Sequence, residues 1–234
     1  MLLGSRDPAQ PLLTLRDGQA RVELSGSTTA NWIAKTANLL VDGHDSPDRV
    51  GLLLPLGWQA VCFLLGAAAT GATVVIATDP SELAGCGVAF TTVETAAAAL
   101  AVGVEDVLVV SDHPMGAPLA SVPVGALDAG REVPGYGDRF GGAAVQHPRF
   151  EVAGALVDAT PGLALTADDR LLTCLPLAAG VGIMLAALGA GAALVLAPAP
   201  DDLDRLAVAA AEQVTVTAGL TVCGLRRVDL PAPS

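Results

Sequence analysis

The feature that most constrains the fold of this chain is a pattern that occurs twice. Each copy begins with an Asp-Arg pair and an apolar segment, turns at Leu-Pro-Leu, and ends with Gly-Ala before a second apolar segment. The first copy consists of Asp48-Arg49-Val50, Leu54-Pro55-Leu56, Gly71-Ala72, Val74-Val75-Ile76-Ala77 and Pro80, and the second of Asp169-Arg170-Leu171, Leu175-Pro176-Leu177, Gly191-Ala192, Leu194-Val195-Leu196-Ala197 and Pro200. The offset is 121 residues at the start (169 − 48) and 120 at the end (191 − 71). Such a pattern is typical of a strand–helix–strand unit, so it predicts two related α/β lobes.

Strands and helices are predicted to alternate along both copies. In the first half, strands are expected at 20–24, 50–54, 73–77, 88–91 and 106–110, and helices at 58–69, 93–101 and from about 25–29 to a stop at Gly43. In the second half, strands are expected at 171–174, 193–197 and 214–218, and helices at 148–159, 182–188 and 201–212. Strands joined by helical crossovers are parallel, so we predict mainly parallel sheets flanked by helices.

A segment rich in proline and glycine separates the two copies. Residues 112–142 contain four prolines and seven glycines, which predicts an irregular connection with at most short strands. We therefore expect a first lobe at 1–140, including this connection, and a second, smaller lobe at 141–234. The tail at 226–234 is expected to be frayed, and residues 1–19 are interpreted as a polar leader.

Composition excludes some classes of partner. The net charge of −12 and an isoelectric point near 4.4 argue against nucleic-acid binding, which needs clustered basic residues. The four cysteines, Cys62, Cys86, Cys174 and Cys223, have no paired spacing, so buried free thiols in a reducing compartment are expected. The residues from Met1 to Asp7 lack the basic start and apolar run of a signal peptide, which predicts a cytoplasmic protein.

Two uncharged runs, at 50–78 and 171–200, are long enough to suggest membrane spans. Pro55 and Gly71 interrupt the first run, and the piece between them is too short to cross a bilayer of ~30 Å at 1.5 Å per residue. Parallel strands buried on both faces are also continuously apolar. A sheet in a soluble protein therefore explains both runs, and no membrane partner is predicted.

The chain resembles the acyl-adenylate-forming (AMP-binding) enzymes in several segments. The segments that carry the resemblance are Ala30–Val41, Asp48–Pro55, Ala69–Val75 with Asp79-Pro80, His147, Leu165–Arg170, Leu175–Leu177, Gly189–Leu196 and Val214–Thr217. More specifically, Asn31–Leu40 resembles a small actinobacterial family of uncharacterised, truncated relatives of these synthetases. The resemblance implies the fold of the N-terminal part of such enzymes, and membership in the small family implies no function.

The resemblance also shows which catalytic sequence is missing. An adenylating enzyme needs a Ser/Thr/Gly-rich loop with a lysine, whose amides and hydroxyls hold the ATP phosphates. The chain at that position, Tyr136–Val145, contains no serine, threonine or lysine. The adenine, ribose and magnesium regions and the C-terminal domain with the catalytic lysine have no counterpart. Lys35, the chain's one lysine, lies on an early helix and cannot replace it.

The resemblance places any remaining ligand site at Gln146, His147, Leu177, Ala178 and Gly180. His147 stands where the family has its serine–histidine step, although a histidine before Pro148 is equally a surface cap. His44 and His113 lie in turn-like segments and are expected to be exposed. No spacing predicts a metal site, a nucleophile or a cofactor, so no catalytic residue is assigned.

Three motifs have structural interpretations that we favour. Ser25–Thr29 superficially resembles a phosphate loop, but a helix cap at Ser27 or Thr28 explains it better. The glycine pairs at 180/182 and 189/191 lack the third glycine of a dinucleotide fingerprint and favour close packing. The acidic residues Asp201, Asp202 and Asp204 favour a helix start rather than a metal site.

The leading hypothesis is a non-catalytic remnant of the AMP-binding synthetase fold that acts as an interaction or regulatory module. It would work through a protein partner or as a homo-oligomer. One alternative is a protein that binds an acyl or nucleotide ligand in a groove between the lobes. Another is half of an enzyme that a second chain completes.

Overall fold

The computed structural model describes residues 3–18, 20–143, 145–198 and 204–228. The predicted Pro200 of the repeat, the helix start at Asp201 and Asp202, and the tail at 229–234 lie outside these residues. The chain forms two compact units, each with its own sheet. Unit 1 comprises residues 1–29, 55–58 and 158–234, and unit 2 comprises residues 30–54 and 59–157. The chain thus passes between units several times, whereas the sequence suggested one boundary near residue 140.

Unit 2 contains a seven-stranded sheet in the order β7-β6-β5-β3-β4-β8-β9. Its strands are β3 (Arg49–Leu53), β4 (Thr73–Ile76), β5 (Val88–Thr91), β6 (Asp106–Val109), β7 (Ala126–Asp128), β8 (Arg149–Val152) and β9 (Ala155–Val157). Its helices are α2 (Trp58–Thr70), α3 (Val93–Ala101), α4 (Ala129–Glu132), the 3-10 turns η2 (Pro80–Leu83) and η3 (Val133–Gly135), and most of α1 (Gly26–Asn38), which continues as the π-helix η1 (Leu39–Gly43). All neighbouring strands are parallel except β8 and β9.

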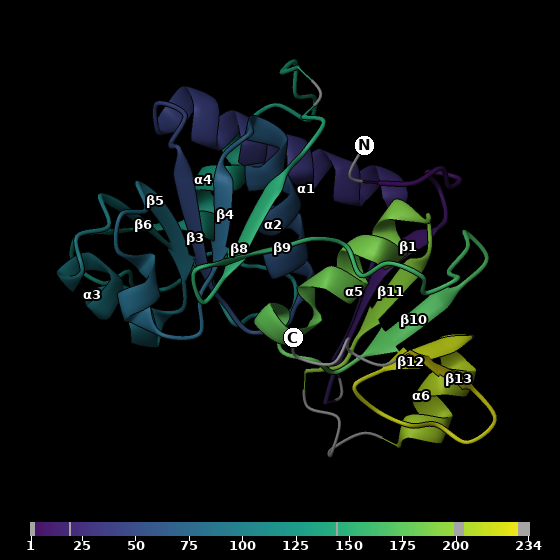
Figure 1. Ribbon diagram of the computed structural model, residues 1–234. Coiled ribbons are helices and arrows are strands. Elements are labelled where there is room, and N and C mark those ends of the chain that lie inside the picture. Colours follow the sequence, from purple (N-terminus) through teal and green to yellow (C-terminus); the bar gives the residue numbers. More distant parts are fainter. Residues whose placement is uncertain (1–2, 19, 144, 199–203, 229–234) are drawn as a thin grey trace. The chain divides into compact units, whose positions relative to one another are not determined.

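Unit 1 contains a six-stranded sheet in the order β13-β12-β10-β11-β1-β2. Its elements are β1 (Pro11–Asp17), β2 (Ala20–Ser25), β10 (Arg170–Thr173), α5 (Leu177–Gly189), β11 (Ala193–Leu196), α6 (Arg205–Ala211), β12 (Val216–Ala218) and β13 (Arg226–Val228). Among the described strands of unit 1, β1 and β2 pair antiparallel and the other neighbours pair parallel. Figure 1 shows the strands of each sheet side by side.

The two copies of the repeat have the same strand pairing. In unit 2, Arg49 pairs with Thr73, and in unit 1, Arg170 pairs with Ala193, so the register reproduces both sequence offsets. The strand orders β6-β5-β3-β4 and β13-β12-β10-β11 also correspond. Each copy is completed by an antiparallel hairpin, β8–β9 or β1–β2, beside its second strand. The prediction of two related α/β units with mainly parallel sheets is confirmed.

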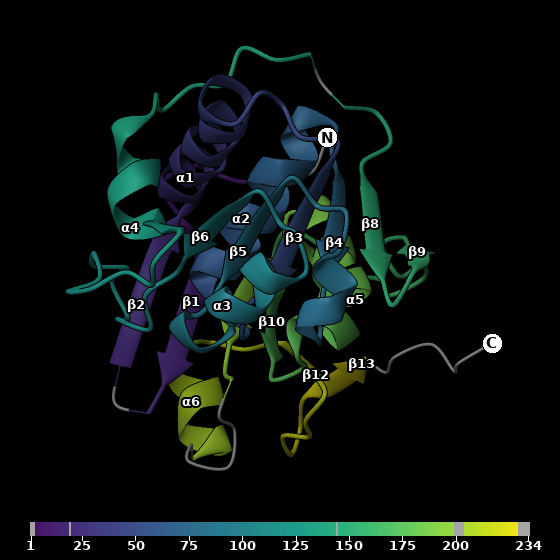
Figure 2. The ribbon, with the colours of Figure 1, turned by 90° about the vertical axis from the view of Figure 1, so that its left-hand side faces the viewer.

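Helices cover both faces of each sheet because successive crossovers run in opposite directions. From β3 the chain steps to β4 on one side and then back past β3 to β5, and right-handed crossovers place the two connections on opposite faces. In unit 2, Phe63 of α2 stacks on Phe90 of β5 with ring centroids 4.5 Å apart, while Ala96 of α3 packs with Val107 on the other face. Figure 2 shows α3 and α2 on opposite sides of this sheet.

The predicted helix at 148–159 is wrong, because these residues form the hairpin β8–β9. Ala153 and Gly154 both have positive φ, 48° and 78°, which a two-residue hairpin turn requires and a helix excludes. Phe150 is buried, and Glu151 forms an ion pair with Arg49 at 3.0 Å. These contacts come from a distant strand, so periodicity within the segment did not indicate them.

The N-terminal and C-terminal strands were also missed. Residues 11–17, interpreted as a polar leader, form β1, whose four residues from Leu12 to Leu15 are buried between β11 and β2. Residues 226–228 of the expected frayed tail form β13 beside β12. The buried position of β1 depends on the strand β11, which is distant in the sequence, and β13 is a strand of only three residues, too short for a local pattern to identify.

No helix in the described part of the chain is both long and apolar enough to cross a membrane. The longest apolar helices are α2 and α5, each of 13 residues. Both uncharged runs contain two strands and one helix, as predicted.

Helices α1 and α2 approach closely at Gly66. A Cβ atom at this position would lie 2.5 Å from Cβ of Thr36 and 3.0 Å from the carbonyl oxygen of Ile33. The Thr36 side chain cannot turn aside freely because its hydroxyl donates to the Trp32 carbonyl at 2.8 Å. Glycine is therefore required here by packing rather than by backbone conformation.

Gly66→Ala should lower the free energy of unfolding by about 1 kcal/mol or more. Overpacking costs ~1–3 kcal/mol, which exceeds the gain of up to ~1 kcal/mol that alanine brings to a helix. Urea denaturation measures the difference. Gly57→Ala is the control, since a Cβ there meets nothing within 4 Å; equal stability of the two variants would contradict the packing argument.

Candidate functional site

The segment at 134–139, which overlaps the first residues of the stretch 136–145 where the resemblance places the phosphate loop, is bound to helix α1. Lys35 Nζ donates to the carbonyl oxygens of Pro134 at 3.0 Å and Tyr136 at 2.6 Å. It also pairs with the Asp138 carboxylate at 2.9 Å. One turn later, Asn38 Nδ2 donates to the carbonyl oxygens of two further residues, 137 and 139, each at 2.9 Å. The chain's one lysine thus fixes this segment through acceptors of the segment itself.

Helix α1 can hold the segment because positions 35 and 38 lie on the same helix face. The helix begins after Ser25, whose hydroxyl oxygen accepts the Thr28 amide at 3.1 Å and lies 2.9 Å from the Ser27 hydroxyl. The favoured cap interpretation of 25–29 therefore agrees with the geometry, with Ser25 rather than Ser27 or Thr28 as the capping residue. The hydroxyls of this motif bond to one another and to the helix start.

Gln146 and His147 lie in the loop that leads into β8 of unit 2, and both side chains are exposed. Leu177, Ala178 and Gly180 lie in the first turn of α5 in unit 1, where Leu177 and Gly180 are buried. The five residues are thus divided between the two units. A shared ligand site at these positions stays a prediction.

Two glycines of α5, Gly180 and Gly182, have packing roles within unit 1. A Cβ at Gly180 would lie 3.0 Å from Cβ of Leu175, and one at Gly182 would lie 2.8 Å from Oγ1 of Thr160. The helix begins at Leu177, five residues before the predicted start, and these glycines lie inside it. Close packing, the favoured interpretation, accounts for Gly180 and Gly182. It does not hold for Gly189, where a Cβ would meet nothing within 4 Å, whereas Gly191 has both a positive φ of 81° and a close approach to the Ser5 carbonyl oxygen.

The expectation that His44 is exposed is wrong. Its side chain is only 6% exposed, and Nδ1 lies 2.7 Å from Oδ2 of Asp106. The two residues are 62 positions apart and meet because parallel strands begin at the same edge of a sheet. His113 is exposed, as predicted. Nothing in the local sequence distinguished the two histidines.

Of the four cysteines, Cys62 and Cys86 are buried, whereas Cys174 is half-buried and Cys223 is exposed. Burial raises the pKa of the Cys62 thiol far above its usual range. Burial likewise raises the pKa of Cys86, against the opposing effect of the nearby Arg49 guanidinium. These two thiols are therefore inert packing residues.

Unit 1 contains a buried carboxylate, that of Glu212, surrounded by three arginines. Arg21 binds it with two hydrogen bonds, Nε to Oε1 at 2.8 Å and Nη2 to Oε2 at 3.0 Å. Arg16 and Arg170 lie at 3.5 and 3.6 Å. The hydrogen bonds from Arg21 lower the pKa of Glu212, although burial opposes the shift. Since Glu212 follows α6, this cluster fixes the helix end to the β1–β2 hairpin.

Solved structures define the class of fold. The chain matches an acyl-CoA synthetase from Brucella canis with a TM-score of 0.70 at 17% identity, covering 91% of this chain and 45% of the other. It matches the N-terminal domain of FACL13 from Mycobacterium tuberculosis with a TM-score of 0.67 at 18% identity, covering 91% and 59%. The fold is that of the N-terminal part of adenylate-forming enzymes, and the chain spans about half the length of those synthetases.

The family of this chain is shown by its similarity to one curated protein. The chain is 34% identical over 224 residues to a TIGR03089 family protein of Mycobacterium tuberculosis, an alignment that covers 89% of this chain and 91% of the relative. The chain belongs to this family. No family model matches it.

Lys35→Met should destabilise the protein by about 1–2 kcal/mol, because charge-assisted hydrogen bonds to the 134–139 segment are lost. Amide hydrogen exchange should become faster in 134–139. Arg139→Met is the matched control, since it removes the same charge from an exposed side chain and should cost less than ~0.5 kcal/mol. Equal effects of the two variants would rule out the anchoring role.

Glu212→Gln should lower stability at pH 7 by about 1–3 kcal/mol. The folded-state pKa of Glu212 is depressed, so its contribution is present above the unfolded value of about 4.3 and is lost as pH falls through the folded pKa. The difference from the parent protein should therefore shrink in acid. Glu23→Gln, which removes one exposed ion pair to Arg21, should cost less than ~1 kcal/mol and serves as control. A pH-independent difference would contradict this account.

Proposed function

We propose that this protein is a non-catalytic member of the adenylate-forming fold that acts as an interaction or regulatory module. The observation that carries the proposal is the binding of Lys35 to the 134–139 segment. A phosphate loop needs a lysine free to reach the phosphates and hydroxyls that donate to them. Here the one lysine is held by carbonyl oxygens and the Asp138 carboxylate, and residues 136–145 include no hydroxyl other than the Tyr136 phenol.

The family relative supports the same proposal. The Mycobacterium tuberculosis protein is matched over 91% of its own length, so it is of similar length to this chain. Two proteins that correspond to about half of a synthetase suggest a unit retained for its surface or its scaffold. A fold never fixes a function by itself, so the activity must be tested directly.

The purified protein should release no pyrophosphate from ATP and magnesium with any member of a panel of short, long-chain and aromatic carboxylic acids. The lysine-free variant Lys35→Met and a blank without protein set the background. The melting temperature should also stay unchanged with ATP, AMP or coenzyme A. A ligand at a hundred times its Kd adds ~2.7 kcal/mol, which for this size means a rise of roughly 5–10 °C.

Two results would overturn the proposal in different ways. Pyrophosphate release above the background would establish an adenylating enzyme. A large thermal shift without pyrophosphate release would favour the alternative of an acyl- or nucleotide-binding protein.

A second candidate is half of an enzyme that another chain completes. The observation that favours it is that the match covers only 45% of the Brucella canis acyl-CoA synthetase chain. In that case pyrophosphate release should appear only when the protein is mixed with a second chain that supplies the remaining regions. The mixture is also tested with the Lys35→Met variant in place of this protein. If pyrophosphate is still released, Lys35 takes no part in the chemistry, and this chain would contribute only as a scaffold.

A further inference from the structure

Strand β2 is an outer strand of the sheet in unit 1, and its outer side has no partner among the described strands. On its inner side it pairs with β1. In the part of the chain that the structure describes, no group outside β1 forms a hydrogen bond with the amide or carbonyl groups of residues 20–24. Figure 2 shows β2 beyond β1 at this end of the sheet. Alternate residues of such an edge strand direct N–H and C=O groups outward, where another strand can pair with them.

β2 lacks the features that protect most edge strands from pairing. Such strands are commonly short, or carry lysine, proline or a bulge. β2 has six residues without lysine or proline, whereas the other outer strands, β7, β9 and β13, have three each. The register shift in its pairing with β1 lies between Pro11 and Leu13, opposite the Ser25 end, so residues 20–24 pair regularly. Among the described outer strands, β2 is therefore the one best suited to strand addition.

The two faces of β2 are self-complementary. Arg21 and Glu23 are exposed on one face, while Val22 and Leu24, each 5% exposed, pack into the core on the other. If a second copy of β2 pairs antiparallel about a twofold axis through Val22, perpendicular to the sheet, Arg21 of each copy lies opposite Glu23 of the other. Side chains directly opposite each other share a face, and opposite charges there stabilise the pair. On the core face, Val22 meets its own counterpart, and pairs of β-branched residues suit a sheet.

The neighbouring registers of the same pairing are disfavoured. A twofold axis at Arg21 or at Glu23 places two like charges directly opposite each other. Arg21 also has donors left for a second carboxylate, because its bonds to Glu212 and Glu23 use Nε and Nη2, and no described residue accepts a hydrogen bond from its Nη1. The charges therefore specify both the partner, a second copy of the same strand, and the register.

We infer that two copies of this chain associate through antiparallel pairing of their β2 strands about a twofold axis at Val22, which joins their six-stranded sheets into one. The inference goes beyond the proposed function, since it names a partner for the interaction module, but it does not depend on that function. A monomeric protein would overturn the inference and leave the proposed function unaffected, whereas pyrophosphate release would overturn the proposed function alone.

Sedimentation-velocity ultracentrifugation of the full chain over a range of concentrations tests the inference. The parent protein should show a monomer–dimer equilibrium in the micromolar range, since an interface centred on one strand pair is small. Glu23→Arg places arginine opposite arginine at both symmetry-related positions and should raise the Kd of the dimer by about tenfold or more. Circular dichroism checks that the variant keeps its fold.

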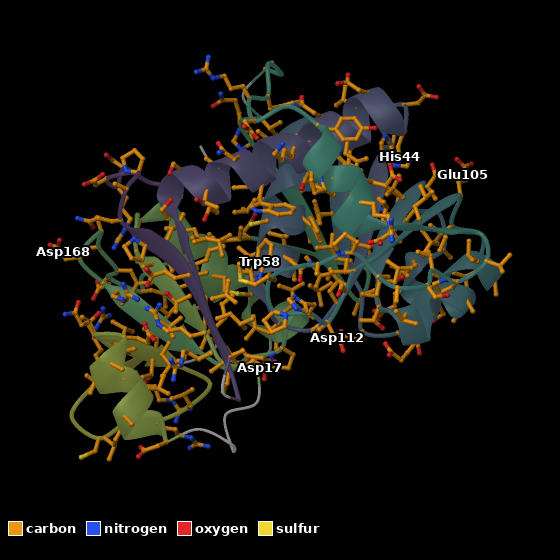
Figure 3. All side chains as sticks on the ribbon, turned by 180° about the vertical axis from the view of Figure 1, so that it is seen from behind. Asp17, His44, Trp58, Glu105, Asp112 and Asp168 are labelled. Carbon is orange, nitrogen blue, oxygen red and sulfur yellow. The ribbon has the colours of Figure 1, made fainter. Side chains whose placement is uncertain are left out.

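Asp168→Arg is the matched control, because it makes the same change of charge at an exposed side chain of unit 1. Asp168 precedes β10, the third strand from β2 in the sheet order. Figure 3 shows Asp168 far from Asp17, which pairs with Ala20 at the start of β2. The control should change the Kd of the dimer by less than about threefold. A monomeric parent protein, or equal weakening by the two variants, would overturn the inference.

Cysteine cross-linking tests the register. With the exposed Cys223 replaced by serine, Val22→Cys should form a disulfide-linked dimer under mild oxidation, because the two Cα atoms at position 22 face each other within the ~4.4–6.8 Å that a disulfide spans. Leu24→Cys is the control, since in this register the two residues at position 24 lie four positions apart, ~13 Å along the strands, and should not cross-link. Equal cross-linking of the two variants would contradict the assigned register and with it the inference.

Discussion

The parallel pairing of two buried strands in each unit is the constraint on which the rest of the structure depends. The pair β3–β4 and the pair β10–β11 have the same register at equivalent positions of the repeat. Nearly all residues of these four strands are buried. A parallel pair requires a crossover, and a crossover in an apolar sheet must be a helix that covers one face. The next connection, in the opposite direction, then covers the other face. The positions of α2, α3, α5 and α6 follow from this sequence of steps.

In both copies of the repeat, the arginine at the start of the first strand contacts the hairpin strand, but its partner residue differs between the copies. In unit 2, Arg49 at the start of β3 reaches Glu151 on the hairpin strand β8. The register places Thr14 of β1 at the equivalent position in unit 1, and Arg170 donates to its hydroxyl at 3.4 Å. The carboxylate of unit 1 comes instead from Glu212. The arginine of each Asp-Arg pair therefore binds the hairpin strand beside its unit's second strand, which accounts for the recurrence of the arginine by packing.

The side chains of Lys35 and His44 both bind partners that are distant in the sequence. Lys35 meets carbonyl oxygens about a hundred residues later, and His44 meets Asp106 across 62 residues. In both cases a helix or its continuation brings a side chain to the edge of the sheet in unit 2. Local patterns predicted the elements, but they placed Lys35 only on an early helix and His44 in an exposed turn. A residue type alone does not reveal burial when its partner comes from another element.

The sequence by itself determined the repeat, the central strands and helices, and the mainly parallel sheets, because apolar periodicity and Gly or Pro breaks are local signals. It also indicated that residues 136–145, where the resemblance places the phosphate loop, contain no serine, threonine or lysine. Tertiary structure decided the hairpins β1–β2 and β8–β9, the strand β13, the division into units, and the burial of His44 and Glu212. These depend on pairing between distant segments, where a few residues gain stability only when the partner strand or opposite charge is already in place.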